Sequence, residues 1–136
     1  MIALDASMTL CWLFVDEATP TSDAVFDRVG RQGAVAPELW PLEIANTLRS
    51  AVRRGRCSQE DADRSINVLL RLRVEIDDQT SARAWGPIRL LSEAHNLSVY
   101  DAAYLELAMR RGLPLASCDR HLVAAAERLG LEVLTA

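Results

Sequence analysis

Four acidic residues stand where distant segments of the chain could bring their carboxylates together: Asp5, Glu43, Asp101 and Asp119. Two unit charges about 4 Å apart repel each other by roughly 4 kcal/mol at an effective dielectric of 20. A fold that gathers four carboxylates therefore needs a compensating cation, and hard oxygen ligands select Mg²⁺ or Mn²⁺. The four residues predict a divalent-cation site and a metal-dependent enzyme that acts on phosphate esters.

Each acid also has an ordinary structural explanation. Asp5 could end a strand in a turn, and Asp119 could cap the N-terminus of a helix. Asp101 lies three residues after Ser98, so the pair could form a capping box. Glu43 could be a solvated helix residue. All four explanations must hold at once if the predicted site does not exist.

Two neighbourhoods favour the site over these explanations. Asp101 shares an expected helix face with Leu105 and Ala108, so its carboxylate should be partly buried. A buried carboxylate needs a partner. Glu43 lies one helical turn before Asn46, which could extend the site with a further polar group.

The bulk composition is that of a globular domain of 136 residues, and we expect a single domain over residues 1–136. A net charge of −4 argues against a protein that coats nucleic acid by bulk attraction. All 15 basic residues are arginines, which excludes mechanisms that use a lysine amine. Arg49, Arg53 and Arg56 are spaced to share one helix face, where they could be solvated, contact RNA phosphates or meet an acidic partner.

The three cysteines show no spacing typical of a metal site, so we expect reduced thiols in a cytoplasmic protein. The apolar run Met8 to Val15 is too short to span a bilayer, and it has no basic region before it. We therefore predict neither a membrane segment nor a signal peptide.

Short apolar runs alternate with helical patterns along the chain, which is typical of an α/β fold. We expect a central parallel sheet of about five short strands, flanked by helices on both faces. The expected strands cover residues 2–4, 34–36, 74–76, 113–116 and 131–134. Ser7 is an expected helix N-cap, and Gly86-Pro87 should bend a helix or begin a new one. Ligands bind beyond the carboxyl ends of such strands, where Asp5 and Asp119 fall.

Four segments carry a family resemblance: Ile2–Ser7, Pro41–Leu48, Ser98–Tyr104 and Leu115–Leu122. They resemble the four motifs of PIN domains, and more specifically those of the VapC toxins of bacterial toxin–antitoxin pairs. Each motif alone is weak. Four of them in order, at fitting separations over nearly the whole chain, make a specific signal.

This resemblance implies a PIN-like fold and an endoribonuclease that uses Mg²⁺ or Mn²⁺, with a metal-activated water that leaves a 5′-phosphate. The four acids would be catalytic and would bind metal: Asp5 and Asp101 directly, with Glu43, and Asp119 directly or through water. The family often has threonine two residues before its last acid, and Ser117 keeps that hydroxyl here. Ser7 could hydrogen-bond a metal-bound water or a phosphate oxygen. Ser7, Asn46 and Ser117 are therefore supporting candidates.

The resemblance also implies partners: an RNA substrate, a cognate VapB-type antitoxin, a second copy in a homodimer, and DNA indirectly through the antitoxin. Two other classes stay open at this point. A phospho-receiver domain would have a similar acidic pocket but uses a lysine, which this chain lacks. A non-catalytic PIN-like module that binds RNA or protein would be expected to lose some of the acids. The acids alone do not distinguish RNA from DNA.

Overall fold

A computed structural model describes residues 1–136 and contains one five-stranded sheet. All neighbouring strands are parallel, and their order is β3-β2-β1-β4-β5. The strands are β1 (Ile2–Leu4), β2 (Ala34–Pro37), β3 (Val74–Asp77), β4 (Leu115–Ala116) and β5 (Val133–Leu134). The predicted α/β fold is confirmed. The order differs from the 2-1-3-4-5 arrangement of flavodoxin-like receiver domains, which argues against the phospho-receiver alternative.

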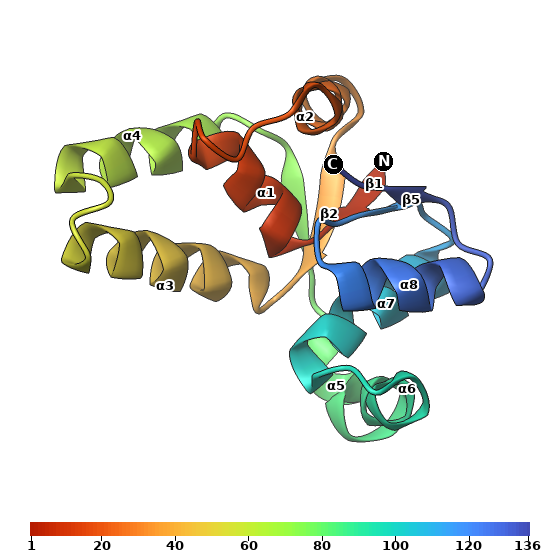
Figure 1. The fold of residues 1–136 in the computed structure, drawn as a ribbon. Helices are drawn as coiled ribbons and strands as arrows, with labels where there is room; N and C mark the ends of the chain where they lie inside the picture. Colours follow the sequence, from red (N-terminus) through yellow and green to blue (C-terminus); the bar gives the residue numbers. More distant parts are fainter.

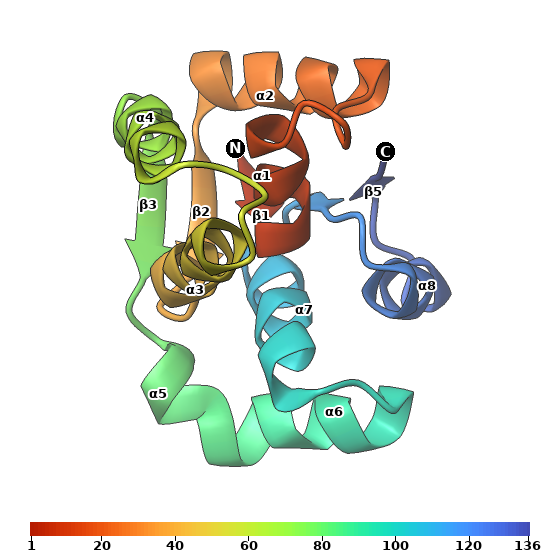
Figure 2. The same cartoon turned by 60° about the vertical axis from the view of Figure 1, so that its left-hand side comes forward.

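Helices cover both faces of this sheet, as Figures 1 and 2 show. In Figure 1, α1, α3 and α4 lie on one side of the sheet, and α7 and α8 lie on the other. The helices are α1 (Ala6–Leu13), α2 (Pro20–Gln32), α3 (Trp40–Arg53), α4 (Gln59–Leu70), α5 (Thr80–Arg83), η1 (Ala84–Ile88), α6 (Arg89–His95), α7 (Val99–Arg111) and α8 (Arg120–Arg128). No helix has both the length and the apolar character needed to cross a membrane.

The central strand and helix α7 form the middle of the core. Ile2, Ala3 and Leu4 of β1 have no exposed surface, because helices cover the sheet on both faces. Helix α7 packs against β1, β2 and β4, and its residues 102–108 are all buried. These contacts place the first turn of α7 near the carboxyl ends of the strands.

Three local expectations need correction. Helix α1 begins at Ala6, so Asp5 and not Ser7 occupies the N-cap position. Strands β4 and β5 are shorter than the predicted 113–116 and 131–134, because both begin two residues later. Gly86 and Pro87 lie in the π-helical segment η1, which continues into α6, so the expected alternative of a new helix at Pro87 is wrong and the expected bend remains.

Candidate active site

The acidic residues converge at the point where the order of the strands reverses. Strand β1 pairs with β2 on one side and with β4 on the other. Asp5 follows β1 directly, and Ser117 follows β4 directly. In open α/β sheets this switch point, at the carboxyl edge, is where ligands bind.

Asp5 is buried there, with only 3% of its surface exposed. Its side chain does not cap helix α1. Instead its Oδ2 accepts hydrogen bonds from the hydroxyls of Ser7, at 2.5 Å, and of Ser117, at 2.7 Å. Its Oδ1 accepts no hydrogen bond from the protein. One carboxylate oxygen is therefore fixed by two segments of chain, and the other is available to a ligand.

The two serines also bind the backbone that follows β4. Ser7 Oγ accepts from the backbone N–H of Cys118 at 2.9 Å, and Ser117 Oγ accepts from that of Asp119 at 3.0 Å. Each hydroxyl has one proton, and Asp5 receives both. The 3.2 Å contact between the two hydroxyl oxygens therefore adds no hydrogen bond of its own. The network holds the β4–α8 connection against the start of α1.

Burial raises the pKa of Asp5 from its ordinary value of 3.8 to about 6. The hydrogen bonds from Ser7 and Ser117 oppose this shift, whereas the nearby charges of Asp101 and Asp119 add to it. Asp5 therefore lies within electrostatic reach of Asp101 and Asp119. A cation beside them would favour the ionised form of Asp5.

Asp101 lies in the first turn of α7, half-buried. Its backbone N–H donates to the N-cap Ser98 Oγ at 3.0 Å, but its carboxylate does not return a bond to the Ser98 backbone. The capping-box explanation thus accounts for the backbone of Asp101 and not for its side chain. Burial raises the pKa of Asp101, and the charge of Asp119 raises it further, against smaller opposing effects of Ser98 and His121.

Glu43 reaches the site from the first turn of α3, where it meets Tyr104. The Tyr104 hydroxyl donates to Glu43 Oε1 at 2.8 Å. Burial raises the pKa of Glu43, this hydrogen bond lowers it, and the charges of Asp5 and Asp101 raise it. Sequence reasoning did not single out Tyr104, although a tyrosine on an apolar helix face needs a partner for its hydroxyl.

Asp119 and Asn46 differ from these three acids. Asp119 caps helix α8, because its Oδ1 accepts a hydrogen bond from the backbone N–H of Leu122 at 3.0 Å. Its charge also acts on both Asp5 and Asp101.

Asn46 is exposed on α3, and its side chain makes no hydrogen bond within the protein. Its supporting role stays a prediction.

The donor set suits a hard divalent cation. No group of three or more His, Cys, Asp or Glu side chains is arranged to hold a metal ion by itself. Mg²⁺ usually binds through one or two carboxylates and keeps several waters, so such a cage is not required. Asp5 Oδ1, an unbonded oxygen on a buried carboxylate, fits this mode of binding.

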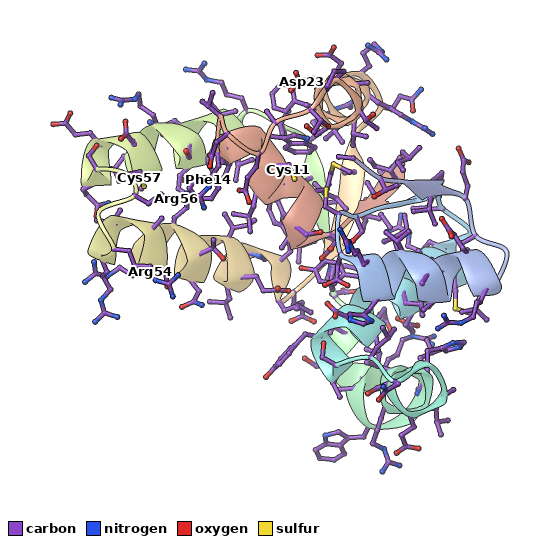
Figure 3. All side chains as sticks on the ribbon, viewed as in Figure 1. Cys11, Phe14, Asp23, Arg54, Arg56 and Cys57 are labelled. Carbon is purple, nitrogen blue, oxygen red and sulfur yellow. The ribbon has the colours of Figure 1, made fainter.

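The three arginines do not share one helix face, so that prediction was wrong for Arg56. Arg49 and Arg53 are exposed on α3, whereas Arg56 lies beyond its end. Arg56 pairs with Asp16 at 3.1 Å and lies over the Phe14 ring at 3.9 Å. Figure 3 shows Arg56 and Phe14 close together between α1 and the α3–α4 turn. Arg56 thus joins two loops of its own chain.

The fold is that of a PIN domain. Residues 2–135 match the PIN domain family, and the chain belongs to that family. It is 31% identical over 85 residues to Ribonuclease VapC3 of Pyrobaculum aerophilum, a match that spans 62% of this chain and 65% of that relative. Its structure resembles the crystal structure of PAE2754 from Pyrobaculum aerophilum, with a TM-score of 0.69, 24% identity and coverage of 96% of this chain and 88% of that one.

Proposed function

We propose that this protein is an endoribonuclease dependent on Mg²⁺ or Mn²⁺, and the toxin of a type II toxin–antitoxin module. Membership of the PIN family and the likeness to a relative named as a VapC ribonuclease support this proposal. The main observation in its support is the environment of the Asp5 carboxylate. This carboxylate is buried at the switch point, and two serines fix one of its oxygens. The other oxygen is unbonded and can bind a cation.

The bound cation would supply hydroxide near neutral pH, by lowering the pKa of its water, and would offset charge on the phosphate. Asp5 and Asp101 would hold it, and Asp119 would act directly or through water. Glu43, oriented by Tyr104, would accept a hydrogen bond from the attacking water. Ser7 and Ser117 would keep Asp5 ionised and in place. Arg49 and Arg53 are the exposed cations on α3 that could follow the phosphate backbone.

RNA and an antitoxin are the proposed partners of the site. The VapC name of the relative supports a VapB-type antitoxin that covers the acidic pocket and an RNA that enters it. We further propose a cytoplasmic homodimer that meets DNA only through the antitoxin.

The test is cleavage of single-stranded RNA by the purified chain with Mn²⁺. We expect cleavage that stops with EDTA and is lost in Asp5→Asn, because the amide cannot supply the anionic ligand. Asp27→Asn, an exposed acid on α2, is the matched control and should cleave normally. Equal cleavage by Asp5→Asn would refute the assignment. Mn²⁺ binding by calorimetry without cleavage of any RNA would favour the non-catalytic binding module instead.

A further inference from the structure

Two of the three cysteines lie together although they are 107 positions apart in the sequence. The Sγ atoms of Cys11, on α1, and Cys118, in the β4–α8 connection, are 3.2 Å apart. Both residues are free thiols and partly exposed, so a small reagent can approach them. Cys57, also free, lies beside Arg56 at the α3–α4 turn, well away from Cys11 in Figure 3.

Cys118 is also tied to the acidic site. It stands between Ser117 and Asp119, and its backbone N–H donates to Ser7 Oγ at 2.9 Å. Ser7 in turn donates to Asp5 Oδ2. The two thiols therefore lie on the same two chain segments, α1 and the β4–α8 connection, whose serine hydroxyls hold Asp5.

We propose that Cys11 and Cys118 are a redox modification site, at which a low-molecular-weight disulfide such as oxidised glutathione forms a reversible cross-link between α1 and the β4–α8 connection. A disulfide bond is about 2.05 Å long, so the two sulfur atoms must approach by about 1 Å, which small side-chain rotations can supply. This inference does not depend on the proposed nuclease activity.

The chemistry is thiol–disulfide exchange in two steps. One cysteine, after losing its proton, attacks the small disulfide, forms a mixed disulfide and releases one small thiolate. The second cysteine loses its proton, attacks the protein sulfur of the mixed disulfide and releases the second small thiolate. The two thiolates take up the two protons. Two electrons pass from the cysteines to the reagent, one S–S bond breaks and one forms.

The cross-link should restrict the segment that carries Ser117 and Asp119. The N–H groups of Cys118 and Asp119 are bonded to Ser7 Oγ and Ser117 Oγ, and both bonds must open before these hydrogens exchange with solvent. A covalent tie beside them makes that opening rarer. We therefore expect hydrogen exchange in residues 117–119 to slow at least severalfold in the oxidised chain.

The experiment treats the full chain with oxidised glutathione and maps the products by intact mass and by peptide mass spectrometry. We expect the loss of two hydrogen atoms from the Cys11 and Cys118 peptides, their joining into one cross-linked species, and full reversal with dithiothreitol. Cys57→Ser should form the same cross-link. Cys11→Ser should instead carry a single glutathione on Cys118 or remain reduced, and its exchange at residues 117–119 should not respond to the oxidant.

Three results would overturn the proposal. The first is a chain that carries glutathione on Cys11 and Cys118 without a cross-link. The second is a cross-link that involves Cys57. The third is a Cys11–Cys118 cross-link with unchanged exchange at residues 117–119, which would show that the bond does not restrain the site.

Discussion

Tyr104 of α7 and Glu43 of α3, which lie 61 positions apart in the sequence, are joined by a 2.8 Å hydrogen bond. Tyr104 has no exposed surface. Burial strongly raises the pKa of its hydroxyl, and the charges of Asp5 and Glu43 raise it further, so the group stays protonated and donates to Glu43. The direction of the Glu43 carboxylate is therefore set by a group inside the core.

Removing that hydroxyl should impair catalysis more than folding. In Tyr104→Phe we expect RNA cleavage to fall about tenfold, because Glu43 is no longer oriented. The free energy of unfolding should drop by only about 1 kcal/mol, since one hydrogen bond is lost and the ring stays packed. Tyr100→Phe, on the exposed side of the same helix, is the control and should match the wild type in rates and urea unfolding. A cleavage rate in Tyr104→Phe equal to that of the control would contradict the role given to Tyr104.

The Ser117 hydroxyl should set the pH at which the site becomes active. Its hydrogen bond lowers the pKa of Asp5, so Ser117→Ala should raise that pKa and move the acidic limb of the pH–rate profile to higher pH. Ser117→Thr keeps a hydroxyl and should restore the wild-type profile. The measurement is cleavage rate against pH at saturating Mn²⁺. If the acidic limb of Ser117→Ala lies at the same pH as that of the wild type, the ionisation of Asp5 does not determine that limb.

Without divalent cations, Asp5 should make the protein less stable as the pH rises. Its pKa is about 6 in the folded chain and 3.8 ordinarily, so between these values the folded state binds more protons than the unfolded state. The free energy of unfolding must then fall as the pH rises through this window, by about 3 kcal/mol for Asp5 alone. Urea unfolding in EDTA, compared with Asp5→Asn at each pH, isolates this effect. The difference between the two proteins should be largest above pH 6 and shrink when Mn²⁺ is added.

Local patterns in the sequence were enough to predict the parallel sheet and the partial burial of Asp101. The apolar runs predicted strands correctly at Ile2 and Ala34, because a buried parallel strand has no polar face. The apolar positions Leu105 and Ala108 correctly indicated that Asp101 is half-buried. Both inferences depend on contacts within one element or between neighbouring strands.

The contacts that complete the site join distant segments, and no local pattern reports them. Ser117 lies 112 positions from Asp5, and Tyr104 lies 61 from Glu43. Arg56 was misplaced because helical spacing was carried past Arg53, where α3 ends, and past Gly55 with its positive φ. Its pairing with Asp16, 40 positions away, could not be read from helical spacing. The approach of Cys11 to Cys118 was likewise invisible in the sequence.

A final prediction concerns Arg110 of α7, which forms ion pairs with two buried acids. Arg110 bonds Asp77 at 2.7 and 3.2 Å and Glu106 at 2.8 Å, and both acids are more than nine-tenths buried. In Arg110→Ala, Arg83 still pairs with Glu106 at 3.3 Å, but Asp77 keeps only the backbone N–H of Gln79. We expect a loss of about 3 kcal/mol in the free energy of unfolding, because removing one partner leaves a buried charge uncompensated.

The neighbouring arginine provides the control for this prediction. Arg111 pairs at 3.2 Å with Glu75, an exposed residue of β3, so Arg111→Ala should cost less than about 1 kcal/mol. The measurement is urea unfolding of both variants at low and high salt. Salt screens an exposed ion pair more than a buried one, so the loss in Arg111→Ala should shrink at high salt and the loss in Arg110→Ala should not. Equal losses in the two variants would mean that Arg110 contributes no more than a surface ion pair.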